Sequence, residues 1–215
     1  MITTVMHDDT DRARMTSLEA ATDHPRTVTF VLMLLAGFLG LVASLVLSLD
    51  ALVLAANPQA ELQCTINSVF DCAAVANSAQ SKVLGIPNAF LGLMLQPAIV
   101  AIAVAKLGGA RMPRWYMAAF NALMLVAILH AHWLLFQSTF VIKALCLWCL
   151  TLLVCTVLVF VLLTRWNLLE GNLSVRGDGE RGRAFVLGGW SEIALIAWFA
   201  IIIAVEAIVW VPSFL

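Results

Sequence analysis

The chain has 215 residues, of which 62% are hydrophobic and only 12% are charged, and its formal net charge is −1. Soluble domains are about half apolar and about a quarter charged, so this composition excludes an ordinary soluble domain and indicates a membrane protein. A net charge so close to zero argues against a nucleic-acid partner.

Residues 1–27 are polar, and they precede an apolar run that is too long for the core of a signal peptide and has no cleavage signal behind it. We interpret them as a mobile cytoplasmic tail. Five apolar runs can each cross a hydrocarbon core of about 30 Å: residues 28–49, 88–107, 115–136, 145–166 and 190–210. None of them alternates as a β-barrel strand does, so the expected fold is an all-α membrane protein with five transmembrane helices.

Lysine and arginine predict the orientation, because they concentrate in cytoplasmic connections. Ten of the twelve fall in the tail and in the second-to-third and fourth-to-fifth connections: Arg12, Arg14, Arg26, Lys106, Arg111, Arg114, Arg165, Arg176, Arg181 and Arg183. Only Lys82 and Lys143 fall in the opposite connections. The amino terminus is therefore expected inside and the carboxyl terminus outside.

Four of the five cysteines form two pairs. Cys64 and Cys72 lie in the first outward loop, residues 57–87, whereas Cys146 and Cys149 open the fourth helix after a short turn at 137–143. The predicted topology places both pairs on the oxidising side, where disulfides persist. Two dithiols at the edge of a bilayer can pass electron pairs by thiol–disulfide exchange. Cys155 lies deeper in the same helix, and we interpret it as a small apolar residue.

The Cys146-Leu-Trp-Cys149 motif has a physical rationale of its own. Residues three apart share a helix face, and the free N–H groups and dipole at a helix start lower a thiol pKa. We expect Cys149 to lie one turn deeper and Cys146 to be the more exposed of the two. A metal site would need two more ligands. His130 and His132 are candidates for these two ligands, but they are two residues apart and therefore lie on different helix faces. Either histidine could instead line a polar cavity.

The chain resembles the vitamin K epoxide reductase family in its bacterial form over about residues 28–166. The resemblance is carried by both cysteine spacings, by Ser81 and by the stretch Gly85-Ile-Pro-Asn-Ala-Phe-Leu-Gly92. It implies a four-helix transmembrane bundle around a quinone site, with the fifth helix, residues 190–212, packed alongside. Bacterial members of this family couple disulfide formation in exported proteins to the reduction of a membrane quinone.

The resemblance also implies a role for each cysteine. Cys149 matches the cysteine that meets the quinone, and Cys146 matches its partner, which exchanges with the loop pair. Cys72 matches the loop cysteine that reaches Cys146. Cys64 matches the one that meets the soluble redox partner.

Two polar residues are implied beside the cysteines. Asn88 matches a residue that hydrogen-bonds a quinone carbonyl, and Ser81 matches a serine that influences the exchange chemistry. Vertebrate members carry a tyrosine where this chain has Leu153, which favours quinone reduction over epoxide chemistry. The sequence does not distinguish menaquinone from ubiquinone.

Some bacterial members carry a thioredoxin-like domain after the fifth helix. No such sequence follows here, so we expect a separate exported thioredoxin-fold, DsbA-like partner. The expected location is the inner or plasma membrane, with the active site on the extracytoplasmic side and residues 167–189 forming a cytoplasmic loop without chemistry. Two alternatives stay open. A membrane metal carrier or sensor would use the four paired cysteines as ligands. A transporter of reducing equivalents would need redox cysteines deep in its helices, where only Cys155 lies.

Overall fold

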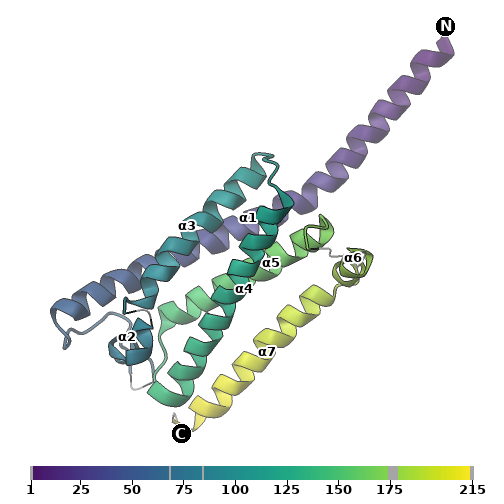
Figure 1. Ribbon diagram of the computed structural model, residues 1–215. Helices are drawn as coiled ribbons and strands as arrows, with labels where there is room; N and C mark the ends of the chain where they lie inside the picture. Colours follow the sequence, from purple (N-terminus) through teal and green to yellow (C-terminus); the bar gives the residue numbers. More distant parts are fainter. Residues whose placement is uncertain (1, 68, 84, 174–178, 214–215) are drawn as a thin grey trace.

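The computed structural model describes residues 2–67, 69–83, 85–173 and 179–213. Five helical segments in this part are long and apolar enough to cross a membrane (Figure 1), which confirms the all-α membrane fold: Arg26–Ala56, Asn88–Leu107, Arg114–Ile142, Leu147–Leu169 and Trp190–Trp210. The second and fifth have the predicted bounds. The others extend a few residues past their apolar runs, since a helix continues until a breaking residue or a tertiary contact ends it. Arg176, which entered the charge asymmetry, lies outside the described residues.

Helix α1 (Ile2–Ala56) is continuous from the second residue of the chain. Its first part, drawn in purple, projects away from the bundle in Figure 1. The segment that the sequence suggests to be a mobile tail is therefore helical in the structure. The segment contains no glycine, and its one proline, Pro25, stands next to the start of the membrane span, so no helix-breaking residue interrupts it before that point.

Helices α1, α3 (Asn88–Leu107), α4 (Arg114–Phe136) and α5 (Leu147–Leu169) form the bundle, with Phe30, Met33 and Ile99 fully buried between them. Small residues allow α1 and α3 to approach closely, as in many membrane helix pairs. A Cβ at Gly92 would lie 2.5 Å from Ser44 Oγ, and a Cβ at Gly40 would lie 2.6 Å from the amide nitrogen of Gln96.

Helix α7 (Trp190–Trp210) lies beside this bundle with most of its surface exposed, and polar contacts join it to the bundle. Trp198 Nε1 donates a hydrogen bond to His132 Nε2 at 2.6 Å, and Glu206 Oε1 lies 2.8 Å from Thr139 Oγ1. Before α7, helix α6 (Gly179–Leu187) buries Val186, so the connection expected to be a loop is partly a packed helix.

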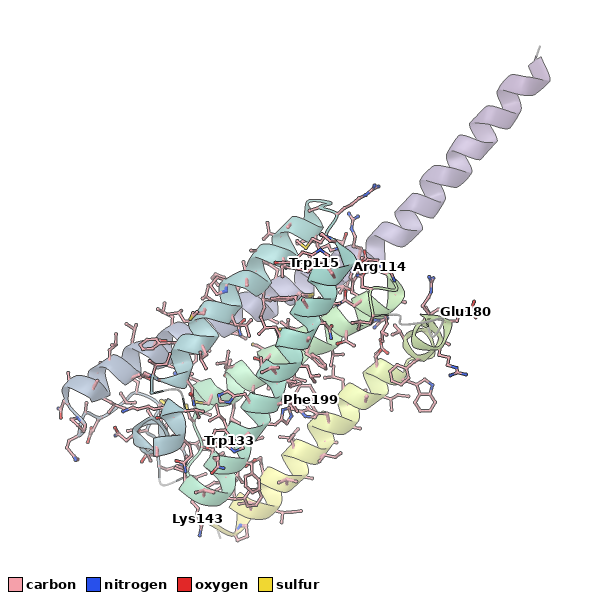
Figure 2. All side chains as sticks on the ribbon, in the orientation of Figure 1. Arg114, Trp115, Trp133, Lys143, Glu180 and Phe199 are labelled. Atoms are coloured by element: carbon pink, nitrogen blue, oxygen red, sulfur yellow. A yellow bond between two sulfur atoms is a disulfide. The ribbon has the colours of Figure 1, made fainter. Side chains whose placement is uncertain are left out.

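The two ends of the bundle differ in chemistry. One end, called here the arginine end, carries Arg114, Trp115 and Glu180, and the other, the cysteine end, carries Lys143 (Figure 2). The arginine end is closed by polar contacts between helices, such as Lys106 Nζ with Glu170 Oε2 at 3.5 Å. The cysteine end consists of three short helical segments: α2 (Cys72–Asn77), η1 (Ala79–Lys82) and η2 (Gln137–Ile142), the last a π-helix.

Candidate active site

The loop pair is joined as a disulfide. Cys64 and Cys72 are bonded through their sulfur atoms, with their Cα atoms 5.7 Å apart. Cys72 is the first residue of α2, and the preceding Asp71 caps that helix by accepting the backbone N–H of Ala74 at 3.0 Å. Both cysteines are buried, at 6% and 1% exposure, so the folded loop covers its own disulfide.

A short parallel bridge joins the loop to the segment before α5. The backbone N–H of Leu145 donates to Val69 O at 2.7 Å, and the N–H of Asp71 donates to Leu145 O at 3.0 Å. Cys72 and Cys146 each directly follow one of these bonded residues, and both belong to one buried apolar cluster. The bridge therefore holds the two cysteine-bearing segments together. It occupies one residue on each side, so no strand pattern in the sequence signals it.

Of the two motif cysteines, Cys146 is the one that the N–H groups at the start of α5 contact. It is the N-cap of α5, and its sulfur accepts the backbone N–H of Cys149 at 3.3 Å. The hydrogen bond from the Cys149 side chain, helped by backbone N–H groups, lowers the pKa of Cys146, against the opposing effects of burial and of the charge of Asp50. Of the two motif cysteines, Cys146 is therefore the one whose thiolate the surrounding hydrogen bonds stabilise.

The expected order of exposure is wrong. Cys146 is 2% exposed, whereas Cys149 is exposed and lines a cavity. The N-cap position places Cys146 against the loop bridge and the cluster with Cys72, and the next turn of α5 directs Cys149 into the open space. Cys155 is buried in the bundle core, as expected of a small apolar residue.

The turn that precedes the Cys146–Cys149 motif has an unusual backbone conformation. The π-helix η2 ends at Lys143, which has left-handed backbone angles of φ 56° and ψ 44°. Such angles are costly for a residue with a Cβ and persist only where the surroundings impose them. The Ser138 hydroxyl donates to Ala144 O across this turn. A π-helical turn is frequent at functional sites, and here it leads directly into Leu145 and Cys146.

The cavity at the cysteine end has a volume of about 160 Å³. Its lining comes from α1, α2, η1, the start of α3, the end of α4 with η2, and the start of α5, and most of it is apolar. It contains three of the cysteines together with both predicted polar residues: Cys72, Cys146, Cys149, Ser81 and Asn88. The volume is below the roughly 300 Å³ of a cavity that encloses a drug-sized ligand, so a larger molecule would be enclosed only in part.

The two polar residues make local hydrogen bonds. Asn88 donates one amide hydrogen to Gln80 O at 2.8 Å and accepts the N–H of Val83 at 3.2 Å, which leaves its second amide hydrogen for a ligand oxygen. The Ser81 hydroxyl lies 2.6 Å from Ala76 O and 2.7 Å from the carbonyl of Ser78. Asn88 thus keeps one amide hydrogen beyond these two bonds, and Ser81 ties η1 to α2.

The two histidines lie apart from the cysteines. His132 contacts Ile128 O through Nδ1 and Trp198 through Nε2, and His130 stacks against Trp133. Within the described ranges, no three His, Cys, Asp or Glu side chains are grouped as a metal site requires.

A family model covers the part of the chain that builds this site. The model of the vitamin K epoxide reductase family matches residues 31–164, from the first transmembrane helix through most of α5, and it includes all four paired cysteines. No curated protein matches the chain. The matched segment is more than half of the sequence and contains the cavity and both dithiols, and such a site suits an exchange of electron pairs between thiols and a ring in the membrane. The chain therefore belongs to the vitamin K epoxide reductase family, as a membrane thiol oxidoreductase that works with a quinone.

Proposed function

We propose that this protein reoxidises a separate exported thioredoxin-fold, DsbA-like protein and passes the electrons through both cysteine pairs to a membrane quinone, thereby supporting disulfide-bond formation. One observation carries the proposal: Cys72, Cys146 and Cys149 line a single apolar cavity, and Cys72 is disulfide-bonded to Cys64. A relay of two dithiols that ends at a membrane cavity matches this chemistry.

The orientation is part of the proposal. The Lys and Arg asymmetry supports an inner or plasma membrane location with the amino terminus in the cytoplasm and the cysteine end outside. On that side the loop pair, Cys64 and Cys72, meets exported proteins in an oxidising compartment, where thiols of folding proteins must lose electrons.

The first step is exchange with the partner. A partner thiolate attacks Cys64 Sγ, the bond between Cys64 and Cys72 breaks, and the second partner thiol attacks the mixed disulfide. The partner leaves as a disulfide, and both loop cysteines become thiols. Because Cys64 is only 6% exposed, the segment around it must move aside for the partner to reach it.

The second step moves the electron pair inward. The Cys72 thiolate attacks Cys146 Sγ in an oxidised Cys146–Cys149 pair, and Cys149 leaves and takes a proton. Cys64 then attacks Cys72 Sγ, which restores the loop disulfide and releases Cys146 as a thiolate. The arrangement with a loop disulfide and free Cys146 and Cys149 is the product of this step.

The third step transfers the electrons of the reduced Cys146–Cys149 pair to an acceptor in the cavity. Oxidation of the Cys146–Cys149 dithiol forms one S–S bond and releases two electrons and two protons, and a quinone bound in the cavity would accept them. Cys149 is the sulfur that is accessible from the cavity, and Cys146 is held beside it at the start of α5. Asn88 would donate its second amide hydrogen to a quinone oxygen. Losing a donor of this kind typically lowers a rate about a hundredfold or more.

The two alternatives find less support. Two of the four cysteines that a metal carrier would use are joined in a disulfide and cannot act as thiolate ligands. A transporter of reducing equivalents would need a second redox cysteine deep in its helices. Cys155, which lies in the membrane-spanning part of α5, is packed among apolar residues of the bundle core.

A quinone-reduction assay on the detergent-purified protein, with a reduced thioredoxin-fold protein as the electron donor, tests the proposal. Quinol should form with the wild type, and menaquinone and ubiquinone analogues assayed side by side identify the preferred acceptor. Absence of quinol formation with both analogues would refute the quinone end of the path.

The matched variants separate the two ends of the relay. Cys64→Ala should lose turnover with the protein donor but keep reduction of the inner pair by dithiothreitol. Cys149→Ala should lose quinone reduction while still trapping a mixed disulfide between Cys72 and Cys146. Normal turnover of the protein donor by Cys64→Ala would show that the loop pair is not the entry point.

A further inference from the structure

Glu206 is an acidic residue inside the fifth membrane-spanning helix, one turn before α7 ends at Trp210. Ionisable side chains within a membrane span are costly, and they commonly mark a functional role. Both carboxyl oxygens of Glu206 are hydrogen-bonded to neutral groups. Trp210 Nε1 donates to Oε2 at 2.9 Å, and Thr139 Oγ1 lies 2.8 Å from Oε1. The second contact joins α7 to η2, the π-helical turn before Cys146.

Thr139 connects α7 to the candidate active site. It is 2% exposed, and its neighbour Ser138 lines the cavity and donates to Ala144 O across the turn. Ala144 is followed by Leu145, which forms the bridge to the loop, and by Cys146, the N-cap of α5. Two adjacent residues of η2 therefore join the end of α7 to the segment that holds Cys146.

The turn needs contacts from outside itself. It ends at Lys143 with left-handed backbone angles, which persist only where the surroundings impose them. The Thr139 hydroxyl has one hydrogen and two acceptors in reach, Glu206 Oε1 and Leu135 O, the latter at 2.9 Å. Leu135 belongs to α4, which η2 continues, so a bond to its carbonyl ties the turn to no other helix. Glu206 is therefore the acceptor that holds η2 against α7.

Polar side-chain pairs join α7 to the bundle at three levels, from the arginine end to the cysteine end: Arg165 with Glu192, His132 with Trp198, and Thr139 with Glu206. Among these three pairs, only the last reaches η2. In Figure 1 the corresponding end of α7 lies beside the end of α4. This support comes from a helix that begins after the segment that the family model matches.

We propose that Glu206 is a positioning residue for the Cys146–Cys149 pair: through Thr139 it holds η2 in the conformation that covers Cys146 and forms one wall of the cavity. Ser138 of η2 belongs to that wall. The inference rests on the proposed function, in which the cysteine pair passes its electrons to a ligand of the cavity.

Removal of the Glu206 carboxyl should loosen the turn without unfolding the bundle. The Thr139 hydroxyl would then donate only to Leu135 O, and η2 would open more often by local fluctuation. Interhelical hydrogen bonds in membrane proteins shift such equilibria about threefold to tenfold. Cys146 is 2% exposed while the turn is closed. Each opening uncovers it, so its rate of alkylation should rise by the same factor.

The test needs no quinone. The detergent-purified protein, with Cys146 and Cys149 reduced, is labelled briefly with iodoacetamide, and mass spectrometry gives the rate at each cysteine. Glu206→Leu should raise the rate at Cys146 about fivefold. Thr139→Val removes the same contact from its other side and should give the same rise, so the test stands even if one variant fails to fold. The double variant should give no further rise, because both substitutions remove one interaction.

Two matched variants serve as controls. Glu206→Gln keeps an acceptor for the Thr139 hydroxyl and should keep the wild-type rate at Cys146. Trp198→Phe removes the hydrogen bond to His132 halfway along the same helix, and it should also leave the rate at Cys146 unchanged.

The outcomes separate this inference from the proposed function. An unchanged rate at Cys146 in both Glu206→Leu and Thr139→Val would overturn the role of Glu206. An equal rise in Trp198→Phe would also overturn it, because the turn would then respond to any loosening of α7. Faster labelling of Cys146 in the two variants of a protein that reduces no quinone would refute the proposed function and leave the role of Glu206 standing.

Discussion

Replacing Gly92 by alanine tests how closely α1 and α3 must approach beside the cavity. The added Cβ would lie 2.5 Å from Ser44 Oγ and 3.2 Å from Leu152 Cδ2, whereas ordinary contacts begin at 3.4 Å. The two helices must separate, or both neighbours must move. Overpacking of this kind costs about 1–3 kcal/mol, and the better helix propensity of alanine offsets up to about 1 kcal/mol. We expect a net loss of about 1–2 kcal/mol in the free energy of unfolding.

Ser44 supplies the matched partner for a double-mutant cycle. Its hydroxyl is buried without a hydrogen-bond partner among the described residues, so Ser44→Ala alone should be neutral or slightly stabilising. In the double variant the closest contact is removed, and the remaining neighbours, Ser44 Cβ at 3.3 Å and the Leu152 methyl at 3.2 Å, can adjust by a few tenths of an ångström. Most of the stability lost in Gly92→Ala should therefore return.

The cycle is measured as the free energy of unfolding of all four proteins in mixed micelles with increasing SDS. We expect a coupling energy of about 1 kcal/mol, well above the roughly 0.3–0.5 kcal/mol within which independent sites are additive. Additive effects of the two substitutions would refute the steric explanation. A Gly92→Ala protein as stable as the wild type would also refute the steric explanation, because α1 and α3 would then not be in close contact at Gly92.

Three further predictions address the cysteine end. Asp71→Ala removes the cap of α2, worth about 1 kcal/mol, and should slow the appearance of the Cys72–Cys146 mixed disulfide in a Cys149→Ala background. Asp71→Asn keeps the cap and should not slow it, and equal rates in the two variants would contradict the capping role. Lys143→Gly relieves a left-handed residue and should unfold no more easily than the wild type, whereas Lys143→Val should lose about 1 kcal/mol or more; the midpoint of thermal unfolding checks both. Cys149→Ala removes the leading cause of the lowered pKa of Cys146, so alkylation of Cys146 should begin at a higher pH, and an unchanged pH profile would refute that cause.

The sequence predicts the helices well where apolar runs end at breaking residues. The span 88–107 follows Pro87 and precedes Gly108, and the span 190–210 follows Gly189, so composition and local conformation give the same bounds. The third span is longer than predicted because η2 continues it as a π-helix to Ile142. That extension depends on contacts at the cysteine end, which a hydropathy pattern does not contain.

The site is predictable in its residues but not in its geometry. The cysteine spacings and Asn88 identify residues that line one cavity. The bridge at Leu145, however, is made by backbone groups, and any residue except proline supplies those. The exposure of Cys149 and burial of Cys146 likewise follow from the packing of the loop on α5. Spacing shows that two sulfurs share a helix face, and tertiary structure decides which of them is covered.

The backbone bridge between the loop and the start of α5 also determines which thiols can meet. The bridge pairs Phe70 with Leu145, so Cys72 lies within one residue of the position paired with Cys146, whereas Cys64 lies further away along the chain, and Cys146 is only 2% exposed. A protein thiol, too large to enter the cavity, is therefore directed to the loop pair, whereas a small thiol such as dithiothreitol can reach the inner pair beside the exposed Cys149. The fold thus selects protein donors by how well they fit the loop.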